Sequence, residues 1–119
     1  MKNFLAVYMG SASSPERTKW DALDPASRKE REGAGMKAWS DWMTKHQAVV
    51  VTTGGPLGKT KRVSAKGVAD IKNEMTGYAV VKADSHTAAA ALFESHPHFT
   101  IFPGTAVEIM EALPIPGTR

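Results

Sequence analysis

The chain has 119 residues and no cysteine, with 15 basic and 12 acidic residues and a net charge of +3. The lack of cysteine excludes disulfides and thiolate chemistry. Charges of both signs are mixed along the chain, so the sequence carries no basic stripe suited to nucleic acid. No apolar run approaches the roughly 20 residues that span a bilayer, and the N-terminus lacks a signal-peptide pattern. We therefore expect one cytoplasmic domain, residues 1–119, with no nucleic-acid or membrane partner.

The first half of the chain predicts one strand and two helices. Phe4–Met9 places apolar side chains on both faces of a strand, which is typical of a strand covered on both sides. The Ser-Pro step at 14–15 and the Asp-Pro step at 24–25 are both typical helix starts. The first helix is expected to end near Leu23, and the second to run over about Ala26–His46.

The second of these helices carries two unusual features. Gly33 and Gly35 interrupt it, which indicates either a kink or close backbone packing. Beyond them, large side chains repeat at helical spacing, and they are Met36, Trp39, Met43 and His46, with Trp42 on the edge of the stripe. Because a large apolar side chain contributes about 1.5–3 kcal/mol when well buried, this face is expected to anchor the core.

The middle of the chain predicts strands separated by glycine-rich turns. Ala48–Thr53 is apolar on both faces and is expected to be a buried strand, ending at the turn cluster Gly54–Gly58. Lys61–Ser64 and Val68–Ile71 are expected to form a small exposed hairpin. Gly77–Ala83 then predicts another strand that is apolar on both faces.

The last third predicts one helix and one strand. Asp84-Ser85 is typical of a helix cap, and an alanine-rich helix is expected over about His86–Ser95. Ala106–Glu111 alternates apolar and acidic residues, as a partly exposed last strand does.

This order of elements predicts an α+β, ferredoxin-like βαββαβ domain with an antiparallel sheet. In that topology the strands at Phe4–Met9 and Gly77–Ala83 lie in the middle of the sheet, and both are apolar on both faces. Two helices cover only one face of such a sheet. A second copy packed against the other face would bury it, so we expect a homodimer.

With this order established, the sequence resembles the YCII-related family, also known for its DGPF motif. The matching segments are Tyr8–Gly10, Trp39–Met43, Gly54–Leu57, Gly77-Tyr78, Asp84-Ser85, His96–His98 and Val107–Ile109. The resemblance implies a dimeric α+β barrel built from ferredoxin-like subunits. Some members use a His/Asp pair in the cleft between helix and sheet. Here the family histidine falls near Ala38 or Trp39, the family aspartate falls at His96, and the DGPF tetrapeptide is missing, so that pair is not carried over.

His96-Pro97-His98 is the strongest candidate for chemistry. An imidazole can act as a general base near neutral pH, and we take His98, helped by His96, as the candidate catalytic residues. Two histidines at this spacing also suit a metal, but two ligands do not make a site. The third and fourth would have to come from distant residues such as His46, His86 or Asp84, so no metal is predicted. The structural alternative is a helix-terminal His96 followed by a partly buried His98.

A ligand pocket is expected from aromatic residues and a turn. Trp39, Trp42 and Tyr8 are candidate lining residues, although aromatic side chains at helical spacing also serve as core. Gly55 lies in a turn where the missing side chain lets a ligand approach the backbone, although it also suits a purely structural turn. Gly58-Lys59-Thr60 does not fit a phosphate loop, because no helix follows it.

These observations favour a small-molecule-binding homodimer whose cleft is enzymatic, or a degenerate enzyme, through His96 and His98. The alternative is a non-catalytic accessory or structural dimerisation module. No cofactor is predicted. An imidazole that faces a cavity lined by Trp39 or Trp42 would favour the first hypothesis, and two imidazoles that point into solvent would exclude it.

Overall fold

The computed structural model describes residues 1–117 of the chain. Its elements are β1 (Lys2–Met9), α1 (Pro15–Asp21), α2 (Pro25–Lys45), β2 (Val50–Pro56), β3 (Thr60–Ser64), β4 (Gly67–Ile71), β5 (Met75–Ala83), α3 (His86–Ala91), α4 (Pro97–Thr100) and β6 (Ala106–Glu111). Each predicted strand and helix is present, and α4 is an additional short helix.

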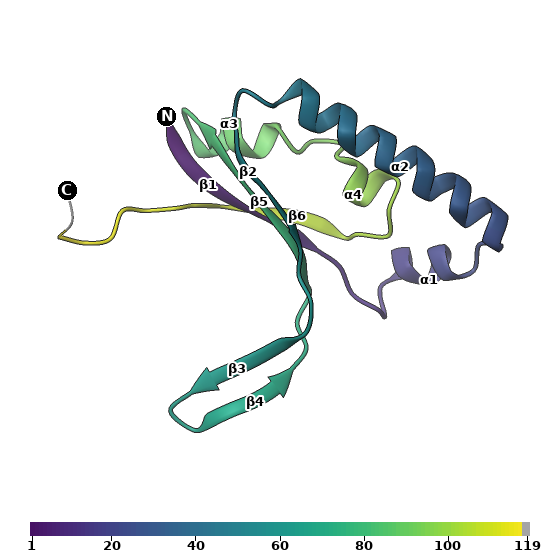
Figure 1. Cartoon of the computed structure of the whole chain (residues 1–119), viewed down its shortest axis with the longest axis horizontal. Coiled ribbons are helices and arrows are strands. Elements are labelled where there is room, and N and C mark those ends of the chain that lie inside the picture. The colour runs from purple at the N-terminus through teal and green to yellow at the C-terminus, as the bar shows by residue number, and fades with distance from the viewer. Residues whose placement is uncertain (118–119) are drawn as a thin grey trace.

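Four strands form one antiparallel sheet in the order β2-β5-β1-β6. The two strands predicted to be central, β1 and β5, lie in the middle, where Leu5 of β1 faces Val80 of β5 and Met110 of β6. This is the ferredoxin-like α+β arrangement, so the predicted fold class is confirmed. The single chain forms an open sheet, and β3 and β4 form a separate hairpin that projects from it (Figure 1).

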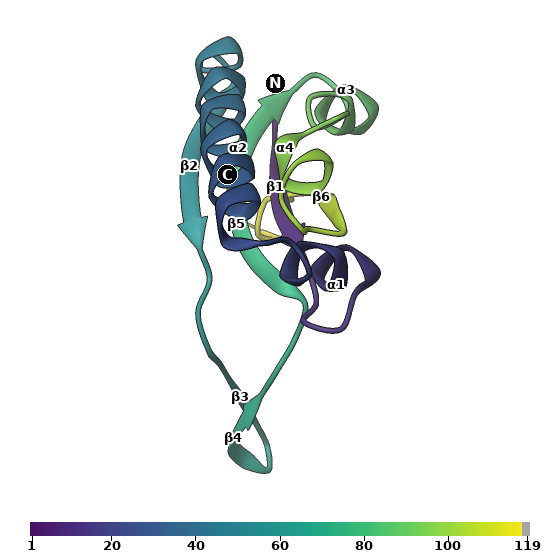
Figure 2. The ribbon, with the colours of Figure 1, turned by 90° about the vertical axis from the view of Figure 1, so that its right-hand side faces the viewer.

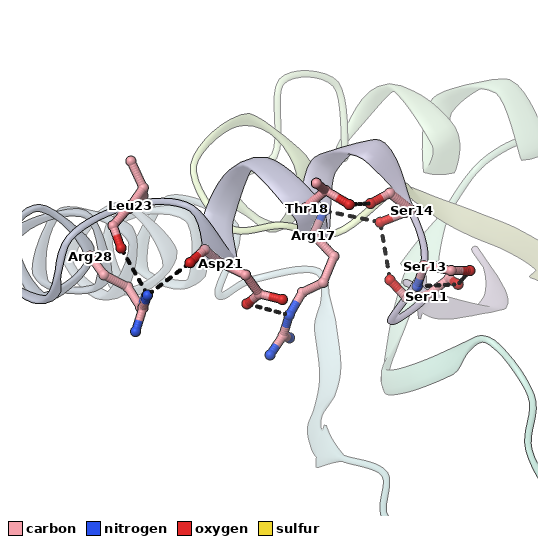
Figure 3. Close-up of polar contacts among 8 residues, drawn as sticks. All are labelled: Ser11, Ser13, Ser14, Arg17, Thr18, Asp21, Leu23 and Arg28. Carbon is pink, nitrogen blue, oxygen red and sulfur yellow. Dashed lines mark hydrogen bonds and ion pairs between the residues drawn. The ribbon is translucent and has the colours of Figure 1, made fainter.

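Capping residues fix the starts of the first two helices. The Ser14 side chain accepts a hydrogen bond from the Arg17 backbone N–H at 3.1 Å, and Asp24 accepts one from the Ser27 N–H at 2.7 Å. The Arg28 guanidinium joins α1 to α2 by donating to the backbone carbonyl oxygens of Asp21 and Leu23, at 3.2 and 2.9 Å (Figure 3). These contacts set where α2 begins and therefore which of its side chains reach the sheet.

The helices gather on one side of the four-stranded sheet (Figure 2). The core lies between them and consists of Phe4, Ala6, Tyr8, Trp42, Ala79, Val81, Ala83, Ala89 and Phe93. The alternation predicted for β1 is therefore correct, since Phe4, Ala6 and Tyr8 point to the same side.

Four details differ from the sequence-based expectations. β2 continues to Pro56, so Gly54 and Gly55, which were expected in a turn, lie in the strand, where the register with β5 is irregular. Met36 of α2 is 65% exposed and is not part of the core. β2 is an edge strand with a single neighbour, so Val51 is 52% exposed where a buried strand was expected. The alanine-rich helix α3 ends at Ala91, and Ser95, with φ of 56°, separates it from α4.

The opposite side of the sheet is the open face, defined here by Leu5, Val7, Val80 and Met110. Their pairing register places them side by side on β5, β1 and β6. No helix within residues 1–117 lies over them (Figures 1 and 2). Met110 is 42% exposed, Leu5 and Val80 are half-buried, and Val7 is buried. The sheet therefore presents an apolar patch with no helical cover, and the exposed Lys82 and Glu108 lie beside it on the same face.

Within the described residues, no helix combines the length and apolar character that crossing a bilayer requires.

Candidate functional site

A cavity of about 470 Å³ lies where α2 passes over the ends of β1, β2 and β5. Its volume is in the range of small-molecule sites. It is lined by Tyr8, Met36, Trp39, Ser40, Thr53, Gly55, Pro56, Thr76, Gly77, Tyr78, His98 and Phe102. The cavity wall is thus largely apolar and aromatic, with hydroxyl groups and one imidazole as its polar side chains.

The aromatic part of the wall is a contiguous group of rings. The ring centroids of Tyr8 and Trp39 are 4.9 Å apart, and those of Trp39 and Phe102 are 6.0 Å apart. Such spacings are typical of favourable aromatic pairs. The rings come from β1, from α2 and from the segment after α4, so the wall forms only when the chain has folded.

His98 supplies the imidazole of the wall. Its Nε2 lies 2.7 Å from the carbonyl oxygen of Met9 at the end of β1. Because a carbonyl oxygen only accepts hydrogen bonds, Nε2 carries the proton and Nδ1 keeps its lone pair. Burial lowers the pKa of His98, and the bond to Met9 opposes that shift. Near neutral pH, His98 is therefore a neutral base with one free acceptor atom.

Gly104 holds the His98 ring from behind. A methyl group at this position would overlap three atoms of the imidazole. The Gly104 backbone N–H also donates to the His98 carbonyl oxygen at 3.0 Å. The ring is therefore fixed between Gly104 and the Met9 carbonyl.

His96 lies behind His98 and does not line the cavity. It is 0% exposed, and its Nδ1 accepts a hydrogen bond from the backbone N–H of His98 at 3.0 Å, which caps α4. Burial lowers its pKa to about 4, with smaller contributions from the neighbouring His98 and His46. His96 is thus a neutral side chain that fixes the backbone carrying His98.

Tyr8 combines a place in the wall with a buried hydroxyl. The side chain is 4% exposed, and its ring centroid lies 5.2 Å from that of His98. Its hydroxyl has no hydrogen-bond partner among residues 1–117. Burial raises the pKa of Tyr8 to about 12, so the phenol stays protonated at neutral pH.

Four of the six predicted site residues meet at this cavity, and they are Tyr8, Trp39, Gly55 and His98. His96 and Trp42 are not among the lining residues. The Trp42 indole N–H donates to the Leu92 carbonyl oxygen at 2.8 Å, which uses this side chain in the core.

Sequence reasoning missed Met36 and Phe102 as parts of the wall. Met36 lies one helical turn before Trp39, so the same periodicity that assigned it to the core also placed it beside the pocket. Phe102 follows α4 in an irregular segment, and no local pattern marks it.

A wider groove of about 1640 Å³ opens beside the cavity along the base of the β3–β4 hairpin, and His98 borders both. Two of its cations are paired, since Lys61 contacts Asp70 at 2.7 Å and Arg17 contacts Asp21 at 3.1 Å. Both pairs are exposed, and such pairs are weak. The smaller cavity combines the imidazole with a wall of aromatic rings, which the groove lacks, and is therefore the better candidate site.

The donor set of the cavity contains no carboxylate. Across residues 1–117 no group of three or more His, Asp or Glu side chains is placed to hold a metal. The polar side chains of the cavity wall include the His98 imidazole and the hydroxyl groups around it.

No family model matches the sequence, and no curated protein matches it either. The fold is similar to a solved structure of 5-chloro-2-hydroxyhydroquinone dehydrochlorinase from Burkholderia phenoliruptrix AC1100, in complex with 2,5-dihydroxybenzoquinone. The TM-score is 0.51 at 16% sequence identity, and the match covers 91% of this chain and 90% of the other. At this identity the likeness shows the fold alone, which is a ferredoxin-like α+β fold with an antiparallel sheet.

Proposed function

We propose that this protein binds a small, flat, hydroxylated ring compound in the cavity beside His98. The observation that carries the proposal is the combination of an aromatic wall with one fixed imidazole. Rings such as Tyr8 and Trp39 pack well against a flat ligand. The Nδ1 lone pair of His98 can accept a hydrogen bond from a ligand hydroxyl. The bound quinone of the structurally similar dehydrochlorinase has the same chemical character.

In the catalytic form of this proposal, His98 is the general base that takes a proton from the ligand hydroxyl. Its lowered pKa keeps it unprotonated near neutral pH, as this role requires. His96 takes part by holding the His98 backbone, because it lies outside the cavity. The absence of a carboxylate from the cavity wall favours the alternative, a binding or accessory protein without turnover.

The binding experiment uses 2,5-dihydroxybenzoquinone as the probe, by calorimetry and thermal shift. A ligand at about 100 times its Kd stabilises the native state by about 2.7 kcal/mol, which raises the melting temperature by several degrees. His98→Asn should weaken binding about 5- to 10-fold. The control is His86→Asn, because His86 is an exposed histidine outside the cavity wall. Absence of binding by the wild-type protein would refute the proposal.

We also propose that two copies associate through the open face. The four side chains that define this face are apolar, and no helix of the described residues lies over them. Burying them between two copies removes their surface from water. Met110→Lys places a charge in the proposed interface and should convert a dimer to a monomer in light scattering. Phe99→Lys makes the same change at a similarly exposed position on α4, on the helical side, and should leave the dimer intact. A wild-type monomer at micromolar concentration would contradict this assembly.

Membership of the YCII-related family is part of the same proposal. Its support is the shared fold, together with the segments that resemble the family, such as Gly54–Leu57 and His96–His98. A sequence profile built from close relatives of this chain would test it.

A further inference from the structure

The Tyr8 hydroxyl is the one buried polar group of the cavity wall whose role the fold does not explain. The hydroxyl lacks a hydrogen-bond partner within residues 1–117, although the side chain is nearly fully buried. Burying a hydroxyl without a partner is unfavourable, because its hydrogen bonds to water are lost and not replaced. A buried group of this kind therefore calls for an explanation.

The position of Tyr8 gives that explanation. Tyr8 lines the cavity, and its ring lies against His98 on one side and Trp39 on the other, at centroid distances of 5.2 and 4.9 Å. The Tyr8 and His98 side chains therefore belong to the same wall. The hydroxyl oxygen itself is buried within that wall, so a ligand reaches it only when the ring moves slightly toward the cavity. A phenol with an unusually high pKa remains a donor throughout the physiological range.

We propose that the Tyr8 hydroxyl donates a hydrogen bond to a carbonyl or oxyanion oxygen of the ligand. His98 and Tyr8 then form a complementary pair, one accepting and one donating. This pair selects rings that carry a hydroxyl together with a carbonyl or oxyanion, over rings with apolar substituents. The inference rests on the proposed function, since it specifies which polar groups the ligand of that cavity must bring.

A buried imidazole nitrogen without a partner has a different explanation. His96 Nε2 is also buried without a partner in the described part of the chain. However, His96 is absent from the cavity wall. Its ring meets Trp39 edge to face at 4.6 Å and an interplanar angle of 89°. A ring N–H in such surroundings is partly compensated by aromatic faces. Tyr8, and not His96, is therefore assigned to the ligand.

The test compares Tyr8→Phe with the wild type, using 2,5-dihydroxybenzoquinone as the probe. The substitution keeps the ring and removes only the hydroxyl. Binding should become roughly 3- to 10-fold weaker, as expected for one lost hydrogen bond. The unfolding midpoint of the free protein should stay the same or rise, because the hydroxyl makes no bond within the described structure that the substitution would break.

Ser14→Ala is the matched control for stability. It also removes one hydroxyl, but this hydroxyl caps α1 outside the cavity. This variant should lower the unfolding midpoint and leave the Kd of the probe unchanged.

Equal affinity of the Tyr8→Phe and wild-type proteins would overturn this inference and leave the proposed function standing. A lower unfolding midpoint of Tyr8→Phe with unchanged affinity would also overturn it, since the hydroxyl would then be structural. If the wild-type protein does not bind the probe, the proposed function fails and this inference fails with it.

Discussion

Gly35 of α2 allows the helix to pass directly over the cavity wall, and replacing it with alanine should disturb that packing. A methyl group at Gly35 would lie 2.5 Å from Cε2 of Phe102 and 3.1 Å from Cγ2 of Ile101. Carbon atoms normally approach to about 3.5–4.0 Å. The Phe102 ring would therefore have to retreat by roughly 1 Å, against its contacts with Trp20 and Trp39.

The magnitude follows from a comparison with Gly33 in the same helix. A methyl group at Gly33 meets no atom within 4 Å, and this residue is exposed. Gly33→Ala should therefore raise the free energy of unfolding by about 1 kcal/mol through helix propensity alone. Gly35→Ala gains the same propensity but carries an overpacking cost of about 1–3 kcal/mol. The Gly35→Ala protein should thus be less stable than the Gly33→Ala protein by about 1–3 kcal/mol.

Urea unfolding followed by tryptophan fluorescence measures both variants under one set of conditions. The difference between the two midpoints is the decisive quantity, because the propensity gain cancels. Equal stability of the two variants would refute the argument and show that the Phe102 ring yields freely. In that case Gly35 would not be needed for the shape of the cavity wall.

Three further predictions concern the edge of the cavity, the core and the response to pH. Gly54→Ala should destabilise the protein by about 3 kcal/mol in urea unfolding. The reason is that Gly54 has φ of 59° and that a methyl group there would overlap a backbone carbonyl of β5. The adjacent Gly55→Ala, where the methyl group would meet open space, should change stability by less than about 1 kcal/mol. Trp42→Phe should cost about 1–3 kcal/mol in the same assay, since it leaves the Leu92 carbonyl without its indole donor. His96 has a native pKa of about 4, below its ordinary value of 6.5, so between these pH values the unfolded chain binds the proton more readily than the native protein does. The contribution of neutral His96 to the free energy of unfolding is therefore complete above pH 6.5, and about 3 kcal/mol of it is lost as the pH falls through this window. Unfolding measured from pH 7 to pH 4 should therefore show a shallower loss for His96→Asn, which keeps a capping acceptor but does not titrate, than for the wild-type protein.

Much of the fold could be predicted because local chemistry and the fold agree. The Ser-Pro and Asp-Pro steps supply the capping residues Ser14 and Asp24, and the helices begin at the prolines that follow them, Pro15 and Pro25. The apolar character of both faces of β1 and β5 identified the central strands before any pairing was known. These features depend on neighbours in sequence, which pattern reasoning can use.

The errors arose where long-range contacts decide the outcome. The periodicity of α2 placed Met36 with the core, but Met36 is 65% exposed and lines the cavity. Gly35 was ambiguous between a kink and close packing, and only the distant Phe102 shows that it is close packing. Phe102 itself has no sequence signal, because its role comes from contacts with α1 and α2.

The two histidines show most clearly how folding divides similar residues between roles. The sequence gives His96 and His98 the same chemistry two positions apart. The cap of α4 turns His96 inward, where its Nδ1 accepts the His98 N–H, and this contact uses the lone pair that a base would need. The Met9 carbonyl takes the Nε2 proton of His98, which leaves the Nδ1 lone pair free beside a cavity. Replacing the two histidines therefore has different consequences. Loss of His98 removes the acceptor atom from the cavity wall, whereas loss of His96 changes the position of His98 and the acid stability of the fold.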